Sequence, residues 1–228
     1  MTARLHFADA GEAGDLAAFL ARLIHYDRAA AVRLQAAGDT LAVFGRPPSF
    51  EVLAIRTARL AKPYEHGLDT TLDVTVSAGE FLEYVGESAQ SVAAAGVAAV
   101  PEAVTGPPWA GVLPPRGGWR QEPALPVMDA VRALVAAAVT EFKARVEELP
   151  AERRVRAELD RVGREIWSRT IGGTELPVRA AHAAQSLGFL RGDALALLSS
   201  GAWLRLRTAY GSVAVRRAGT GGLSVTPA

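Results

Sequence analysis

The chain has 228 residues, of which 50% are hydrophobic and 21% charged, and its formal net charge at pH 7 is +1. This composition is typical of a folded globular protein and excludes a chain that is disordered throughout. The sequence contains no cysteine. Disulfides, thiolate metal sites and cysteine nucleophiles are therefore excluded, and a reducing cytoplasm is the expected location.

The first residues do not have the pattern of a secretory signal. Asp9, Glu12 and Asp15 lie where such a signal needs its apolar core. The longest uncharged apolar runs, such as residues 93–100, are too short to cross a bilayer. We therefore expect no membrane partner.

The charges are unevenly distributed along the chain. Residues 1–150 hold 13 basic and 18 acidic residues, whereas residues 151–228 hold 12 basic and 6 acidic residues. Two interpretations follow. The halves attract each other within one fold, or the basic half faces nucleic acid or another acidic surface.

The first part of the chain predicts a helix followed by a three-strand meander. Apolar residues recur at helical spacing from Leu16 to Ile24, which predicts a helix over 15–25 with Asp15 as its cap. The period then changes to the alternation of a strand. We expect strands over 31–35, 41–44 and 50–60.

A strand and a helix follow. LDVTV at 72–76 alternates like a strand, and the capping-box pattern from Ser77 to Glu80 predicts a helix over 80–88. The segment from there to residue 125 is rich in Ala, Gly and Pro, so we expect mostly irregular chain.

Two long helices come next. Apolar stripes predict helices over 126–148 and 151–171, which Pro150 separates. Acid-before-base pairs at i,i+4 spacing, such as Glu165 and Arg169, should support the second helix. Two helices joined by a proline turn should pack as an antiparallel pair.

A third helix and a second meander complete the chain. The helix begins at Pro177 and ends near Leu190. The alternation of residues 195–216 then predicts three strands, and the tail at 219–228 is expected to add an edge strand.

The two meanders resemble each other in sequence. Shifting residues 28–52 by 163 positions, without a gap, gives seven identities, which include Leu34 with Leu197, Gly38 with Gly201 and Leu41 with Leu204. Strand-turn-strand units also resemble one another for physical reasons alone. An internal pseudo-duplication is therefore a hypothesis.

These elements predict an α+β fold. We expect two small antiparallel β-meanders with covering helices, bridged by the antiparallel helix pair. The chain divides into an N-terminal α+β part at 1–105, a Pro/Gly/Trp crossover at 106–125 and a C-terminal part at 126–228. A single integrated domain is the alternative.

The sequence carries no recognisable catalytic motif. Its four histidines are dispersed, and we expect neither a metal nor a cofactor. There is no nucleophile elbow and no Walker phosphate loop. The glycine-rich stretch 219–222 has no helix behind it to hold a phosphate. No catalytic residue is assigned, and the pattern favours a non-enzyme.

One candidate binding surface lies on the strand WLRLR. Its leucines point to one face, so Trp203, Arg205 and Arg207 point to the other, where Arg216 can join them. Such a face could contact phosphates and stack a base. The alternative is a solvated strand face. A winged-helix interpretation would use the helix after Pro177, which has few polar side chains for base readout.

The second candidate is the loop GVLPPRGGWRQEP at 111–123. Arg116, Trp119 and Arg120 could form an anion-binding rim, together with Arg169. The alternative is a proline-stiffened crossover in which Trp119 is a packing anchor. Because no helix follows the glycines directly, a phosphate loop is excluded.

The arrangement of PPRGGW, a helix, IWSR and a helix that ends in GFL resembles uncharacterised proteins found widely in actinobacteria. The resemblance covers the C-terminal 120 residues or so. It implies a high-GC bacterial origin and no catalytic residue.

Three functional hypotheses follow. The first is a non-enzymatic protein-binding or regulatory module that acts through a protein partner or by self-association as a dimer. The second is a nucleic-acid-binding protein that uses the basic C-terminal helix and meander. The third is an enzyme or small-anion-binding protein with a site near residues 109–120.

Overall fold

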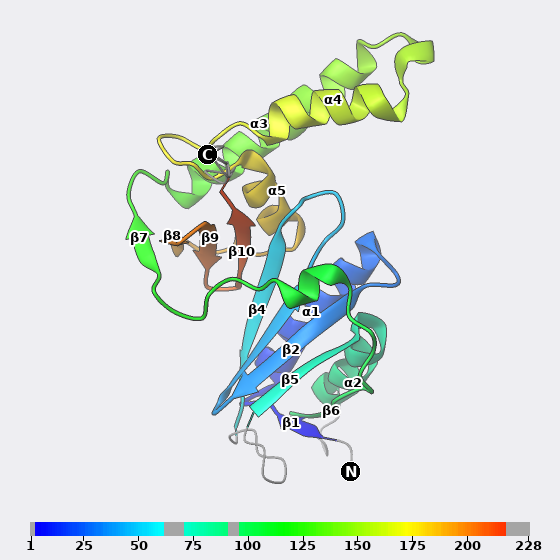
Figure 1. Ribbon diagram of the computed structural model, residues 1–228, viewed down its shortest axis with the longest axis vertical. Coiled ribbons are helices and arrows are strands. Elements are labelled where there is room, and N and C mark those ends of the chain that lie inside the picture. The colour runs from blue at the N-terminus through cyan, green and yellow to red at the C-terminus, as the bar shows by residue number, and fades with distance from the viewer. Residues whose placement is uncertain (1–2, 62–70, 91–95, 218–228) are drawn as a thin grey trace, which may run out of the picture.

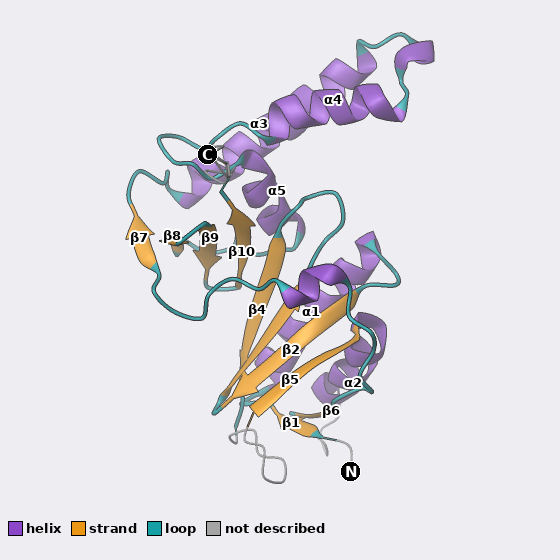
Figure 2. Cartoon of the chain, viewed as in Figure 1, coloured by secondary structure: helices purple, strands orange, loops and turns teal. Residues whose placement is uncertain are grey.

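The computed structural model describes residues 3–61, 71–90 and 96–217, and its fold is α+β, as predicted (Figures 1 and 2). The expected tail strand lies outside these residues. The strands are β1 (Arg4–His6), β2 (Ala31–Ala37), β3 (Thr40–Gly45), β4 (Leu53–Arg59), β5 (Thr71–Ser77), β6 (Val97–Ala99), β7 (Arg120–Glu122), β8 (Leu195–Ser200), β9 (Trp203–Thr208) and β10 (Gly211–Arg216). The α-helices are α1 (Ala10–Tyr26), α2 (Ala78–Gln90), α3 (Met128–Glu147), α4 (Arg156–Trp167) and α5 (Val178–Ser186), with short 3-10 turns at Pro108–Gly111 and Ala151–Arg153.

The two meanders form one eight-stranded antiparallel sheet, in the order β5-β2-β3-β4-β10-β9-β8-β7. They join edge to edge through β4 and β10, where Ala54 lies opposite Val213. We expected two separate sheets. The physical reason for the difference is that the centres of both strands are buried, over residues 53–56 and 212–215. Buried backbone N–H and C=O groups need hydrogen-bond partners, and pairing β4 with β10 provides them.

The sheet has an approximate twofold arrangement about the β4–β10 pair. A helix precedes each meander, α1 before β2 and α5 before β8. The turn glycines Gly38 and Gly201 both have positive φ, 58° and 54°, which side chains rarely adopt. A shift of 163 residues places Phe44 of β3 on Arg207 of β9. The strand partner of Phe44 is Ile55, and that of Arg207 is Ser212, so these two partners are related by a shift of 157 residues. The ungapped shift is therefore wrong for the third strand, because the β3–β4 loop is longer.

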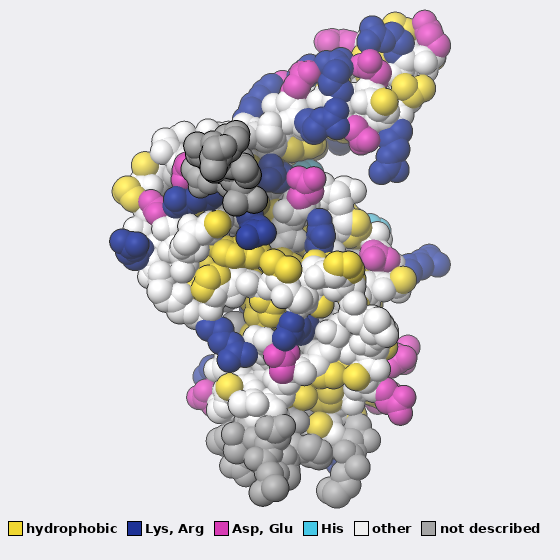
Figure 3. Space-filling model, viewed as in Figure 1, with side chains coloured by type: hydrophobic (Ala, Val, Ile, Leu, Met, Phe, Trp, Pro, Cys, Tyr) yellow, Lys and Arg dark blue, Asp and Glu magenta, His cyan; other side chains and the backbone are white. Residues whose placement is uncertain are grey.

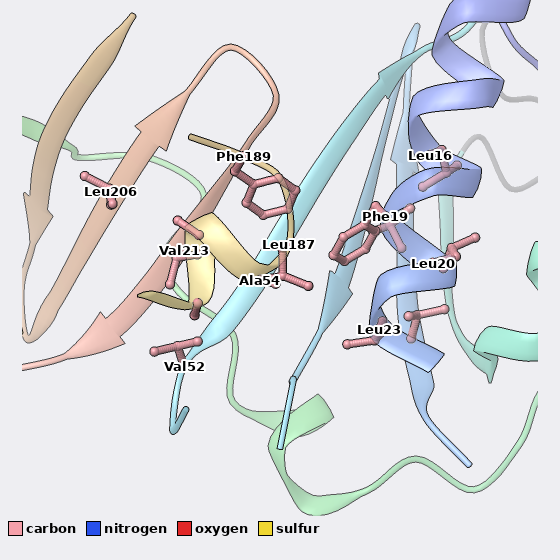
Figure 4. Close-up of a cluster of buried hydrophobic side chains, with 14 of the residues drawn as sticks. Leu16, Phe19, Leu20, Leu23, Val52, Ala54, Leu187, Phe189, Leu206 and Val213 are labelled. Carbon is pink, nitrogen blue, oxygen red and sulfur yellow. The ribbon is translucent and has the colours of Figure 1, made fainter. Parts of the chain in front are cut away.

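Helices α1, α2 and α5 cover one face of the sheet, which we call the inner face, and the main core lies beneath them. Figure 4 shows side chains from both halves of the chain meeting there. The rings of Phe19 on α1 and Phe189 after α5 stack with 5.6 Å between centroids. The core is therefore continuous across the two meanders.

Helix α1 begins earlier than predicted. Asp9, not Asp15, is its N-cap and accepts a hydrogen bond from the Glu12 backbone N–H at 3.0 Å. Asp15 lies one and a half turns further on and pairs with Arg56 at 3.2 Å and with Arg191 at 3.5 Å. One half of the predicted capping box is present, because the Ser77 hydroxyl accepts from the Glu80 N–H at 3.4 Å.

Helices α3 and α4 form the expected antiparallel pair, but this pair does not bridge the meanders. It packs on α5 and extends away from one end of the molecule (Figure 1). Val131 and Ile166 are buried at the near end, whereas Val155 at the far end is 54% exposed. Ion pairs join the two helices, Arg145 with Glu165 and Arg169 with Glu141. The predicted pair of Glu165 with Arg169 is replaced by these contacts.

Candidate functional site on the outer sheet face

The face of the sheet opposite the helices is crossed by one extended segment, residues 101–119, which we call the strap (Figure 1). It begins beside the β5 edge, where the Val104 N–H donates to the Thr75 carbonyl at 2.9 Å. It ends beside β8, where the Ser200 hydroxyl donates to the Gly117 carbonyl at 3.3 Å. The strap therefore spans the sheet from one edge region to the other.

The middle of the strap packs on a small apolar cluster. Phe44, Leu53, Ile55 and Ala214 are the outward-facing residues of the central strands, and all four are buried. The strap residues Trp109 and Leu113 cover them, together with Trp203 of β9. The central strands therefore bury apolar side chains on both faces of the sheet.

A partly buried guanidinium holds the strap against the sheet. Arg33 of β2 donates to the backbone carbonyl of Ala110 and makes a bidentate ion pair with Asp73 of β5 at 2.7 and 2.8 Å. The hydrogen bonds from Arg33 lower the pKa of the Asp73 carboxyl, and Gln35 adds a further one at 3.0 Å. Both carboxylate oxygens of Asp73 therefore already accept hydrogen bonds.

The strap divides the outer face into two grooves. The first, which we call the tryptophan groove, has a volume of about 420 Å³. The apolar residues that line it are Val52, Leu53, Pro108, Trp109, Val112, Trp203, Ala214 and Val215. Three arginines and one carboxylate complete the lining: Arg46, Arg179, Arg216 and Glu51. Figure 3 shows hydrophobic side chains gathered in a band across this face, with basic side chains on both sides of the band.

The charges around the tryptophan groove are mostly positive. Arg216 lies over the Trp203 ring at 5.7 Å, within the range of a cation–π contact. The buried Nε of Arg179 has no hydrogen-bond partner among the described residues. Glu51 is the nearest carboxylate to it, at 3.8 Å.

The second groove, which we call the Arg205 groove, lies on the other side of the strap and has a volume of about 340 Å³. Its apolar floor includes Phe44 and Ile55, and Pro114 and Pro115 of the strap form a wall. Polar side chains complete the lining: Gln35, Thr40, Thr57, Thr71, Asp73, Arg116 and Arg205.

Three of the sequence-derived candidates lie at or beside this groove, because Arg116 and Arg205 line it and Trp119 contacts Arg205. The guanidinium of Arg205 lies over the Trp119 ring at 5.7 Å, and its Nε donates to the Ser212 hydroxyl at 2.8 Å. The Trp119 indole N–H donates to the Pro115 carbonyl at 2.9 Å. Partial burial lowers the pKa of the Arg205 guanidinium, and the charge of Arg207 lowers it further.

The remaining candidates lie apart from this meeting point. Trp203 belongs to the tryptophan groove, whereas Arg207 and Arg120 are exposed and line neither groove. Arg169 is bound by Glu141 through two hydrogen bonds at 2.6 and 2.7 Å on the projecting helix pair. The expectation that Arg169 joins the loop arginines is therefore wrong, because a carboxylate on the neighbouring helix lies within reach.

Helix α5 does not have the geometry of a recognition helix. Its alanines are buried between the sheet and α3, and His182 stacks on Trp167 with 4.5 Å between ring centroids. Burial lowers the pKa of His182. The winged-helix interpretation is therefore not supported by the packing of this helix.

The charge asymmetry of the sequence is partly resolved within the fold. Arginines of the basic half pair with carboxylates of the acidic half: Arg169 with Glu141, Arg179 with Glu51, Arg191 with Asp15 and Arg217 with Glu122. These contacts favour the interpretation in which the two halves attract each other.

Sequence reasoning missed two arginines of this face. Arg46, which lines the tryptophan groove, follows β3 in a proline-rich loop that gave no signal. Arg33, which holds the strap but lines neither groove, lies within an expected strand and gave no separate signal. In the described part of the chain, no three His, Asp or Glu side chains lie close enough to hold a metal ion. None of the described helices is both long and apolar enough to span a bilayer.

Two family models of unknown function match this chain, one in each part. No curated protein matches the sequence. Among solved structures, the chain is similar to the crystal structure of a DNA polymerase sliding clamp from Pseudomonas aeruginosa with ligand, at 13% identity and a TM-score of 0.46. The match covers 95% of this chain and 64% of the clamp chain, so the chain spans less than two thirds of the clamp's length. Residues 1–111 match the family described as Domain of unknown function (DUF8010), and residues 114–220 match Domain of unknown function (DUF8185).

Proposed function

We propose that the protein is a non-enzymatic binding protein whose tryptophan groove takes an acidic polypeptide segment with an apolar anchor residue. The observation that carries the proposal is an accessible apolar groove surrounded by arginines. We further propose a cytoplasmic location, because the sequence contains no cysteine. Cell fractionation tests this location.

The apolar part of the groove suits an anchor side chain. Val112 is 49% exposed, and Trp109 and Trp203 are half-buried beside it. Covering such surface contributes roughly 25 cal/mol per Å². Tryptophan and arginine are also the residue types that most often dominate the energy of protein interfaces.

The charges suit an acidic partner. Arg46, Arg179 and Arg216 line the groove against one carboxylate, Glu51, which is itself largely exposed. An acidic segment would bring carboxylate acceptors to the three guanidinium groups that line the groove. Complementary charge would also speed association and make binding dependent on salt.

The test selects displayed random peptides on the full chain and measures the binding of enriched peptides by fluorescence anisotropy. We expect enriched sequences that combine Asp or Glu with an aromatic or branched aliphatic residue. Arg216→Glu should weaken their binding at least about tenfold, because it reverses the charge of an exposed arginine at the groove.

Arg207→Glu is the matched control. Arg207 is exposed on the same sheet face but outside the groove, so its reversal changes net charge equally. Equal losses in both variants, or enriched peptides without acidic residues, would contradict the proposal.

Nucleic-acid binding is the second candidate function, supported by Trp203, Arg205 and Arg207 on one face of β9. The strap weakens this candidate, because Trp203 packs with Trp109 on the apolar cluster and Trp119 lies against Arg205. Salt-sensitive binding of a single-stranded oligonucleotide that Arg207→Glu abolishes would favour it over a peptide partner.

Self-association and an enzymatic site are distinguished from peptide binding by separate observations. A dimer at micromolar concentration in light scattering, disrupted by Arg216→Glu, would identify the partner as a second copy of the chain. An enzymatic site near residues 109–120 could not use Arg169, because this arginine is paired with Glu141 on the projecting helix pair.

A further inference from the structure

We propose that the Arg205 groove is a second, independent binding site, for a small organic anion that bears a carboxylate or a phosphate on a compact apolar body. The two grooves lie on opposite sides of the strap and share no lining residue. Evidence for or against anion binding in the Arg205 groove therefore does not depend on peptide binding in the tryptophan groove.

The geometry of Arg205 is that of a fixed cation. The hydrogen bond from Nε to Ser212 and the ring of Trp119 hold the guanidinium in place. Its Nη atoms make no hydrogen bond to the described residues, and the side chain lines the groove. A guanidinium fixed at one edge presents its remaining donors in a planar fork, which matches the two oxygens of a carboxylate or phosphate.

The charge of this cation is uncompensated within the described chain. None of the described carboxylates lies within 4.0 Å of Arg205. Asp73 also lines the groove, but Arg33 and Gln35 already engage both of its oxygens. Arg116 adds a second positive charge to the groove. A half-buried charge without a partner is costly, and an anion would offset that cost.

The remaining lining defines the rest of the ligand. Phe44, Ile55 and the two strap prolines form apolar surface beside the arginines, and threonine hydroxyls lie at the far end. A volume of about 340 Å³ suits a molecule the size of a substituted benzene ring. We therefore infer an amphipathic anion rather than a free inorganic ion.

The experiment titrates the full chain with phenyl phosphate, benzoate, inorganic phosphate and uncharged benzyl alcohol. The readout is the indole N–H resonance of Trp119 in ¹H–¹⁵N spectra, identified with Trp119→Phe. Because this N–H is bonded to the Pro115 carbonyl beside the groove, it should report occupancy. We expect saturable shifts with at least one aromatic anion at a Kd of about 1 mM or below.

The probes separate the two sources of the anionic group and the role of the apolar body. A tighter Kd for phenyl phosphate or for benzoate assigns the phosphate or the carboxylate class. Benzyl alcohol and inorganic phosphate should bind at least about tenfold more weakly than the preferred aromatic anion. Equal affinity for inorganic phosphate, or no saturable shift with either aromatic anion up to about 20 mM, would overturn the proposal.

Matched variants locate the site. Arg205→Gln should weaken the preferred anion at least about tenfold, and Arg207→Gln should change its Kd by less than about twofold. If Arg205→Gln does not fold, Arg116→Gln replaces it, because Arg116 is exposed and lines the same groove. Equal effects of the groove variant and Arg207→Gln would show only general electrostatic attraction and would reject the site.

Discussion

The guanidinium of Arg33 donates a hydrogen bond to the backbone carbonyl of Ala110, which lies 77 residues further along the chain. The same side chain holds Asp73 on the neighbouring strand. Arg33 therefore connects the strap, β2 and β5 at one point on the outer face.

Arg33→Ala should destabilise the fold by about 1–3 kcal/mol, because it removes the two hydrogen bonds to the Asp73 carboxylate and the one to the strap carbonyl. Asp73→Ala removes the carboxylate but keeps the bond to the strap. Urea denaturation of both variants and of the double variant measures the coupling. A cost for Arg33→Ala that vanishes in the Asp73→Ala background would show that the strap bond contributes nothing.

Gly211→Ala should be strongly destabilising, by about 2–4 kcal/mol. Gly211 has a φ of +151°, and a Cβ there would lie 2.6 Å from the buried ring of Phe189. Gly201→Ala is the control, since Gly201 also has a positive φ, +54°, but a Cβ would meet open space. We expect this control to cost only about 1 kcal/mol in thermal or urea unfolding. Similar costs for the two variants would show that the clash with Phe189 relaxes freely.

The alternation of apolar residues was sufficient to orient the strands. Leu204 and Leu206 point into the main core, and Trp203, Arg205 and Arg207 share the outer face, as the strand period predicts. Alternation describes each strand by itself. It does not say which strand edges pair, so the β4–β10 junction was not foreseen.

The strap shows a second limit of sequence reasoning. It lacks a period, and its position depends on side chains far away in the sequence, such as Arg33 and Phe44. The sequence therefore indicated a stiff crossover with tryptophan anchors but not the two grooves that it creates. The sequence also does not show that Arg169 lies away from the loop arginines. Its position follows from the packing of α4 on α3, which brings the carboxylate of Glu141 within reach.

His182 should make the stability depend on pH. Burial lowers its pKa in the folded protein, so between that folded value and the ordinary value near 6.5 the unfolded chain binds more protons. The contribution of His182 is therefore complete above about pH 6.5 and is lost as the pH falls through the folded pKa.

His182→Phe tests this dependence, because phenylalanine keeps an aromatic ring against Trp167 and Phe50 but does not titrate. We expect the free energy of unfolding of the variant to fall less than that of the wild type between about pH 7.5 and 5.5. Identical slopes in urea titrations at several pH values would exclude a role for this histidine.

The two halves should not fold separately, although the two family matches meet within the strap. Cutting the chain after Leu113 would leave β4 and β10 without each other and would divide the core between Phe19 and Phe189. We expect fragments 1–113 and 114–228 each to lack cooperative unfolding by circular dichroism. Mixed together, they should form a 1:1 complex that unfolds cooperatively, because the shared sheet and core are then complete. A fragment that unfolds cooperatively by itself would instead establish an independent domain and would mean that the β4–β10 junction is a docking contact between two stable units.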